Sequence, residues 1–220
     1  GGFYKEIKDL IFWAGLGSII DASEYGLPET ESGKTISKMV NNKYIAEIYG
    51  IELEWQTHFW YLPGLLKGLV LNINYTYTFS ETKYPRTEIK TEYLNRPPWV
   101  STTNIDTFYT DRLLNQPNNI LNVTLGYDYK DFSTRISLLY QDDIFKRANF
   151  WERHRGTSEE YIRWDISVKQ KLPIEGLELL ANFNNISASI ERDINIGTGY
   201  PMREQHYGFT ADVGIRYRIK

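Results

Sequence analysis

The chain contains no cysteine among its 220 residues, which excludes a disulfide framework and any metal site built from thiolates. Its formal net charge is only −3, so the sequence does not indicate electrostatic steering towards nucleic acid, and no nucleic-acid partner is expected. No apolar run is long enough for a transmembrane helix. No signal peptide opens the sequence, so we expect either that a signal was removed or that residues before Gly1 are missing.

Alternation of apolar and polar residues is the main feature that is present, and it is clearest near the C-terminus. From residue 207 to 219, every second position is apolar, and the positions between them are small or polar. Successive side chains of a β-strand point to opposite faces. This segment is therefore predicted to be a strand with one apolar and one polar face, which suits a wall between lipid and water.

The same alternation predicts eight strands. Strict alternation over seven or more residues is typical of strands, and strands of about 9–11 residues cross a bilayer when they are tilted. The predicted strands cover residues 3–13, 44–61, 69–79, 121–129, 132–140, 161–172, 177–186 and 207–219.

The connections between these strands alternate in length. The short ones, 63–68, 130–131 and 173–176, contain the Pro, Gly and Asp residues typical of turns. The long ones cover about 14–43, 80–119, 141–160 and 187–206, and we expect them to lack regular structure. Short periplasmic turns that alternate with long outer loops are typical of outer-membrane barrels. We therefore predict an all-β fold, an antiparallel transmembrane β-barrel of which about eight strands are present.

A β-sandwich outside the membrane would also alternate, with its apolar residues turned inward. The polar face favours the membrane interpretation, because it carries mainly Asn, Thr and Asp, whereas a sandwich usually exposes more Lys and Glu. Aromatic residues near the strand ends also fit the girdles found at lipid headgroups. The charged residues predicted to face inward could pair with one another or with a domain inside the barrel. They are Arg135, Asp165, Asp212 and Arg216.

Several stretches resemble barrel strands of TonB-dependent outer-membrane receptors. They are residues 3–11 (FYKEIKDLI), 49–54 (YGIELE), 69–77, 112–123, 179–186 and the closing GIRYR segment. The resemblance rests on their order and spacing across nearly the whole chain. It implies a 22-stranded barrel around an N-terminal plug. It also implies TonB-driven uptake of a scarce, bulky nutrient such as an iron-siderophore, a vitamin or an oligosaccharide.

The resemblance also implies a location in the bacterial outer membrane and a set of partners. These are outer-membrane lipid and lipopolysaccharide, the remainder of the barrel and the plug (from the same gene or a companion chain), and TonB through that plug. Two features depart from the family. No plug or TonB box precedes the first strand, and the sequence closes on Ile219-Lys220 where the family usually ends on an aromatic residue. We therefore expect residues 1–220 to be one C-terminal barrel segment without a plug domain.

An alternative is a stand-alone eight-stranded outer-membrane barrel that acts as an adhesin or structural anchor, since eight strands can close around a filled interior. That barrel would pair its first strand with its last. A segment of a larger barrel would instead leave both strands as open edges.

The sequence does not predict an enzyme. A barrel phospholipase needs Ser, His and Asn together, and although Ser137 and His154 are available, no spacing singles them out. The three histidines, His58, His154 and His206, are interpreted as solvated or packed in loops. No phosphate-binding loop or zinc motif is present, and the segment 193–195 lacks further oxygen ligands for calcium. No catalytic, cofactor-binding or metal-binding residue is predicted.

Ligand contacts are expected on the long outer loops. Arg binds carboxylate or phosphate in a bidentate way, and Trp and Tyr stack on rings. The same side chains could instead pack the loops together or contact lipopolysaccharide phosphates, and the sequence does not choose between these roles. The candidates are Arg96, Trp99, Tyr109, Arg112, Trp151, Arg153, Tyr200 and Arg203.

Overall fold

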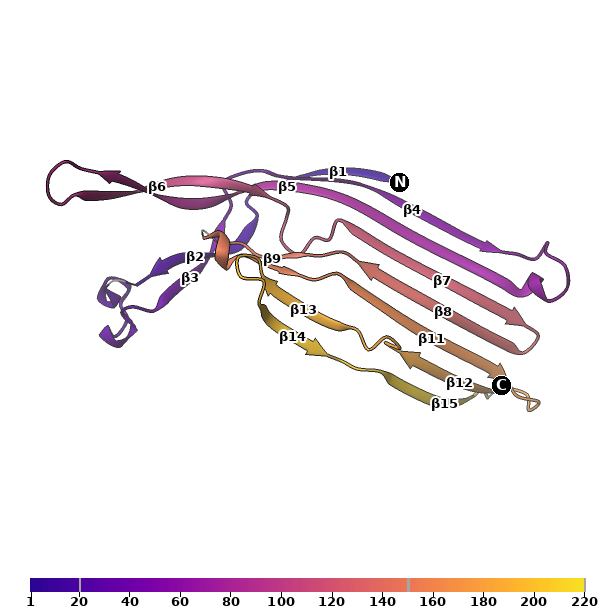
Figure 1. Cartoon of the computed structure of the whole chain (residues 1–220). Helices are drawn as coiled ribbons and strands as arrows, with labels where there is room; N and C mark the ends of the chain where they lie inside the picture. The colour runs from indigo at the N-terminus through magenta and orange to yellow at the C-terminus, as the bar shows by residue number, and fades with distance from the viewer. Residues whose placement is uncertain (20, 150, 220) are drawn as a thin grey trace.

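The largest element of the computed structural model is a nine-stranded antiparallel sheet (Figure 1). The structure describes residues 1–19, 21–149 and 151–219, so Lys220 lies outside the described residues. Along the sheet, eight strands follow one another in the order β1-β4-β5-β7-β8-β11-β12-β15, and β6 pairs with the outer part of β5. Their bounds are β1 Gly2–Ile7, β4 Ala46–His58, β5 Leu69–Tyr93, β6 Val100–Asp111, β7 Asn119–Tyr129, β8 Phe132–Gln141, β11 Tyr161–Lys171, β12 Leu177–Asn184 and β15 Thr210–Tyr217.

Each of the eight predicted strands corresponds to one strand of this path, so the all-β, antiparallel prediction is confirmed. The predicted short connections are also present. The segment between β4 and β5 contains a 3₁₀ turn, η3 (Gly64–Gly68), and tight turns join β7 to β8 and β11 to β12. In the part of the chain that the structure describes, no helix is both long and apolar enough to span a membrane.

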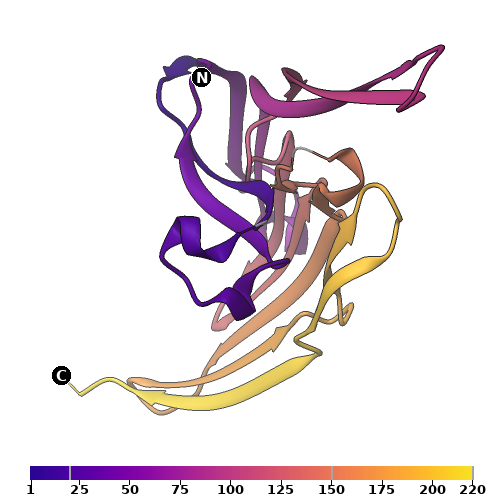
Figure 2. The same cartoon turned by 90° about the vertical axis from the view of Figure 1, so that its left-hand side faces the viewer.

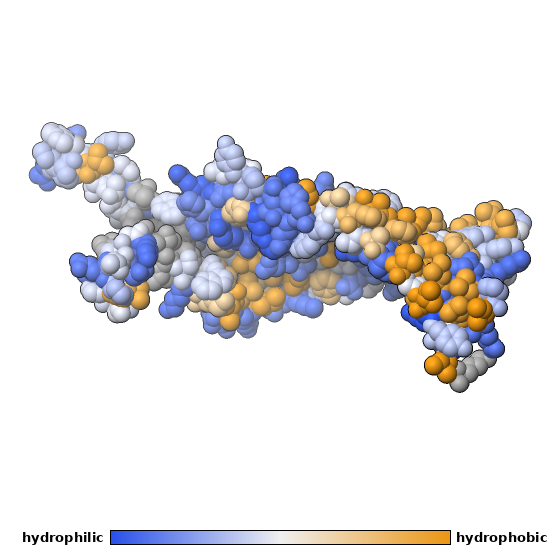
Figure 3. All heavy atoms as spheres, turned by 90° about the horizontal axis from the view of Figure 1, so that it is seen from below, coloured by the Kyte–Doolittle hydropathy of each residue, from blue (hydrophilic) through white to orange (hydrophobic). Residues whose placement is uncertain are grey.

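The strand register places the apolar positions of neighbouring strands in continuous rows. Cross-strand pairing joins Leu71 to Leu125, Leu125 to Ile136, and Ile136 to Ile166, and the row continues to Phe183. Leu125, in the middle of this row, is 47% exposed. Figure 3 shows apolar residues gathered over the end of the molecule where the C-terminal strands lie, and hydrophilic residues over the part nearer the long loops.

The opposite face of the sheet is polar, and its side chains bond to one another. Arg135 donates two hydrogen bonds to the Asp128 carboxylate, at 2.8 and 2.7 Å. Asn182 donates to Asp212 at 2.7 Å, and Arg216 lies 3.7 Å from Glu178. Arg163 donates to Asp165 at 2.9 Å, so each of the four charges predicted to face inward has a partner on the same sheet.

The sheet is curved and open. Figure 2 views it from the end with the long loops and places the two chain ends at opposite limits of the curve. Within the described residues, β1 pairs only with β4 and β15 pairs only with β12. The structure therefore contains a curved, open sheet with two unpaired edges, and we call its path of eight strands the barrel wall after the barrel that the sequence predicts.

The long connections were predicted to lack regular structure, and this prediction is wrong. They contain β2 (Ile11–Ser18) and β3 (Thr35–Asn41), which pair with each other, and a sheet formed by β9 (Phe145–Arg147), β10 (Gly156–Ser158), β13 (Ile190–Asn195) and β14 (Pro201–His206). They also contain short 3₁₀ turns, η1 (Ala22–Tyr25), η2 (Glu29–Glu31) and η4 (Glu152–His154). The alternation was not informative here, because these connections lie outside the long two-faced sheet from which it was derived.

Strand boundaries also differ from the prediction, and two of them differ most. The segment 3–13 is divided between β1 and β2, because Asp9 adopts a left-handed conformation (φ 56°) that a strand does not continue through. The strand predicted over 69–79 continues to Tyr93, because its later residues pair with β6. That outer part contains three Thr, two Tyr and one Ile, and these residue types are enriched in strands.

Gly50 provides a test of the close packing between β1, β4 and β5. A Cβ atom at this position would lie 2.2 Å from the Tyr77 carbonyl oxygen and 2.8 Å from the ring of Phe3, whereas one at Gly214 would meet nothing within 4 Å. We expect Gly50→Ala to lower the free energy of unfolding by about 1–3 kcal/mol, and Gly214→Ala to change it by less than about 0.5 kcal/mol. Urea unfolding in lipid vesicles measures both. Equal losses would contradict the observed packing.

Candidate functional site

A pocket of about 360 Å³ lies at the outer end of the sheet, where β8 and β11 meet the small sheet β9-β10-β13-β14. Leu139, Gln141 and Arg163 line it from the polar face, since they alternate with the apolar residues of β8 and β11. A second hollow of about 250 Å³ shares Tyr161, Arg163 and Glu191 with it. The polar face therefore continues into a recess at the loop end.

Charges in this recess are largely compensated. The Arg192 guanidinium lies 3.0 Å from Glu159 and 2.7 Å from Glu204, and its hydrogen bond keeps the pKa of Glu204 below its usual value. Arg163 donates to Asp165 at 2.9 Å, and Arg203 lies 3.8 Å from Asp193. The recess therefore presents many hydrogen-bonding groups and no concentrated charge of one sign.

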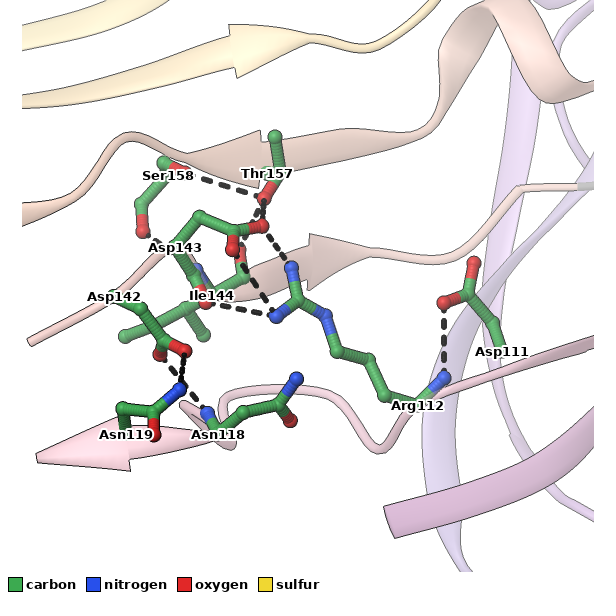
Figure 4. Close-up of polar contacts among 9 residues, drawn as sticks. All are labelled: Asp111, Arg112, Asn118, Asn119, Asp142, Asp143, Ile144, Thr157 and Ser158. Carbon is green, nitrogen blue, oxygen red and sulfur yellow. Dashed lines mark hydrogen bonds and ion pairs between the residues drawn. The ribbon is translucent and has the colours of Figure 1, made fainter. Parts of the chain in front are cut away.

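Arg112 anchors the loops beside this recess (Figure 4). Its guanidinium forms an ion pair with the Asp143 carboxylate and donates to the Asp143 carbonyl oxygen at 2.9 Å. The Thr157 hydroxyl oxygen lies 3.1 Å from the same carboxylate and 2.9 Å from the Ile144 carbonyl oxygen, so its single proton can be donated to either acceptor. These contacts connect the segment after β6 to the segment before β9 and to β10.

The Asp142 carboxylate links the start of β7 to the same loops. Asp142 accepts hydrogen bonds from the Asn118 N–H at 2.9 Å and from Asn119 Nδ2 at 2.8 Å. We call the residues in these contacts the loop network: Arg112, Asn118, Asn119, Asp142, Asp143 and Thr157. Since Ile144 and Ser158 line the recess and Ser158 Oγ accepts from the Ile144 N–H at 3.0 Å, the loop network fixes one wall of the recess.

Aromatic residues form a small core next to the loop network. Tyr84 is fully buried, and its ring centroid lies 5.3 Å from Phe12, 5.5 Å from Tyr109 and 5.7 Å from Phe145. Its hydroxyl donates to the Arg112 carbonyl at 3.1 Å. The core therefore joins β2, β5, β6 and β9.

Burial shifts the pKa of two groups at the edge of this core. It raises the pKa of the Tyr109 hydroxyl and that of the Asp111 carboxyl. The Arg155 guanidinium lies 3.3 Å from the Tyr109 ring centroid, a cation–π contact that attaches the segment after η4 to the core.

The structure separates the eight candidate ligand residues. Arg203 lines the recess, whereas Tyr109 lies in the aromatic core and Arg112 in the loop network. The other five lie at three places: Arg96 and Trp99 at the turn between β5 and β6, Trp151 and Arg153 at η4, and Tyr200 between β13 and β14. A ligand contact at each of them stays a prediction.

Sequence reasoning missed Glu191 and Arg192 as residues of the recess. Both lie in β13, inside a connection that was expected to have no regular structure. Arg163 lies on the polar face of the strand predicted over residues 161–172, so the alternation of that strand was the available signal for it.

The residues considered for catalysis are not assembled into a site. The Ser137 hydroxyl bonds to Thr124 at 3.0 Å within the sheet, while His154 lies in η4. In the described part of the chain, no group of three or more His, Asp or Glu side chains is arranged to hold a metal ion.

Comparison with protein families identifies a related family. A family model described as TonB dependent receptor-like, beta-barrel, matches residues 1–186, a range that includes the loop network and most of the sheet. No curated protein and no solved structure matches the chain significantly.

Proposed function

The chain belongs to the TonB dependent receptor-like β-barrel family, and from this premise we propose that it is the C-terminal barrel part of an outer-membrane receptor. Its function would be TonB-driven uptake of a scarce, bulky nutrient, such as an iron-siderophore, a vitamin or an oligosaccharide. The observation that carries the proposal is the two-faced sheet. Its rows of exposed apolar side chains are suited to contact with lipid. Its polar face, whose side chains are hydrogen-bonded to one another, continues into the recess at the loop end.

The two unpaired edges support a place within a larger barrel. Strand edges need partners, and β1 and β15 lie at opposite limits of the curved sheet (Figure 2). We propose that further strands complete a 22-stranded wall and that a plug, from the same gene or a companion chain, fills it and contacts TonB. Residues 1–220 would then be one barrel segment without the plug. The separated edges make the alternative, a stand-alone eight-stranded adhesin or anchor, the less favoured one.

The outer surface and the loops would have different partners. The apolar rows would contact outer-membrane lipid, and the loop ends would contact lipopolysaccharide. The nutrient would bind at the recess and at the candidate loop residues. The family comprises transporters and not enzymes, and we propose no catalytic activity for this chain.

Cysteine labelling tests the membrane orientation, because the chain has no cysteine of its own. Tyr200 between β13 and β14 is 75% exposed, and Ile174 in the turn between β11 and β12 is 59% exposed. A bulky, membrane-impermeant maleimide should label Tyr200→Cys on intact cells. It should label Ile174→Cys only after the outer membrane is permeabilised. Equal labelling of both on intact cells would refute the proposed orientation.

Uptake itself is tested by deleting the gene and measuring accumulation of radiolabelled ferric siderophores, cobalamin and oligosaccharides. We expect the strain to lose uptake of one of these classes, and a protonophore to abolish the same uptake in the parent strain. Unchanged uptake of all three would contradict the proposed function.

A further inference from the structure

The outer part of β5 and the whole of β6 form a two-stranded ribbon that extends beyond the barrel wall (Figure 1). All 12 residues of β6 pair with β5, from Asp111 opposite Thr82 to Val100 opposite Tyr93, without a register shift. The last residue of β5 that pairs with β4 is Glu81. Beyond that point, β5 has no strand partner other than β6 among the described residues.

One edge of this ribbon is open. Within the part of the chain that the structure describes, β6 pairs with β5 alone. The hydrogen bonding of the turn between β5 and β6 shows which backbone N–H and C=O groups of β6 point away from β5. Leu94 N–H donates to the Trp99 carbonyl at 2.8 Å, and hydrogen-bonded and non-hydrogen-bonded pairs alternate along an antiparallel ladder. The pair Thr91–Thr102 is therefore non-hydrogen-bonded, and the N–H and C=O groups of Thr102 point to the free edge of β6.

The free edge of β6 has few of the features that normally prevent strand addition, since its charged residues are limited to Asp106 and Asp111. Proteins protect exposed edges with Pro, charged residues (Lys above all), bulges or short strands. β6 contains no Pro, Gly, Lys or Arg. The opposite edge of the ribbon is protected by Pro85, Arg86 and Lys90 in β5.

The other free edges of the outer loops are also protected. β14 is six residues long and begins with Pro201, β3 carries Lys38, and β2 has a register shift at Gly15/Gly17. Further barrel strands account for the edges of β1 and β15 under the proposed function. The edge of β6 has no such explanation, because it lies beyond the barrel wall.

We propose that the free edge of β6 binds an extended polypeptide segment of another protein by strand addition. In this mode, main-chain hydrogen bonds provide the affinity. The only charged residues of β6 are aspartates, so the complementary segment is neutral or basic. In Figure 2 the ribbon projects to the side opposite the β2–β3 hairpin, away from the concave face. The partner therefore lies beside the barrel, and the proposal does not depend on uptake.

A labelled peptide with the sequence of residues 86–93 serves as the probe, because this β5 segment already pairs with β6 on its other edge. Fluorescence anisotropy with the full chain in lipid vesicles should show saturable binding, and a scrambled peptide should not bind. Thr102→Pro removes an N–H from the free edge without removing a ladder bond, so it should weaken binding about tenfold or more.

Thr91→Pro is the matched control, because Thr91 is the cross-strand partner of Thr102 and its N–H points to the opposite, protected edge. We expect this variant to change affinity by less than about threefold. The proposal is overturned if the peptide shows no saturable binding, if the scrambled peptide binds equally, or if both variants weaken binding alike. Saturable binding that Thr102→Pro leaves unchanged also overturns it, because the peptide then occupies another site, such as the lumen.

Discussion

Replacing Leu125 by Arg should lower the free energy of unfolding in a lipid bilayer by about 2–4 kcal/mol. Leu125 lies in the apolar row between Leu71 and Ile136, is 47% exposed, and has no protein layer over it in the described structure. If this face contacts acyl chains, the guanidinium must leave water for hydrocarbon. Urea unfolding of the chain in vesicles measures the loss.

Asn122→Arg is the matched control for this prediction. Asn122 lies in the same strand, three residues away, and its side chain belongs to the exposed polar face opposite Asn74. The new charge would enter the water-filled side of the wall, so the free energy of unfolding should change by less than about 0.5 kcal/mol. A larger loss for Asn122→Arg than for Leu125→Arg would mean that the two faces are assigned in reverse.

The strands of the barrel wall could be predicted from sequence because two different environments select their side chains. Between Leu121 and Tyr129 every second residue is apolar, and the register of β7 against β5 and β8 then follows from keeping these residues on one face. Beyond the membrane both faces of a strand contact water or other loops. The outer half of β5 therefore lost the alternation while remaining a strand, and its length could not be predicted.

The site was less predictable than the fold, because residue type does not reveal the contacts of a loop side chain. Tyr109 and Arg112 were candidates for ligand binding since both types are common in binding sites. In the structure, Tyr109 packs against Tyr84 and Arg112 pairs with Asp143, a residue 31 positions away. Such pairings depend on how the loops meet, and no local pattern encodes that. Arg163, on a regular strand, could be placed correctly because the alternation fixed its face.

Tyr84→Ala should produce a large and local loss of stability, about 3–5 kcal/mol, as expected for removing a fully buried aromatic side chain. The variant loses ring contacts with Phe12, Tyr109 and Phe145. It also removes the hydroxyl that donates to the Arg112 carbonyl. The loss should be confined to the outer loops, because the barrel wall has its own ladder of hydrogen bonds. Hydrogen–deuterium exchange should accelerate in residues 112–118 and 142–158 and remain unchanged in β7 and β8.

Two further variants separate the causes of this effect. Tyr84→Phe keeps the ring and removes only the hydrogen bond to Arg112, so it should cost about 1 kcal/mol. Tyr93→Ala removes the same side chain from the same strand where it is 84% exposed, and should change stability by less than about 0.5 kcal/mol. If Tyr84→Ala also accelerates exchange in β7 and β8, the aromatic core and the barrel wall unfold together. In that case the core supports the whole segment and not only the recess.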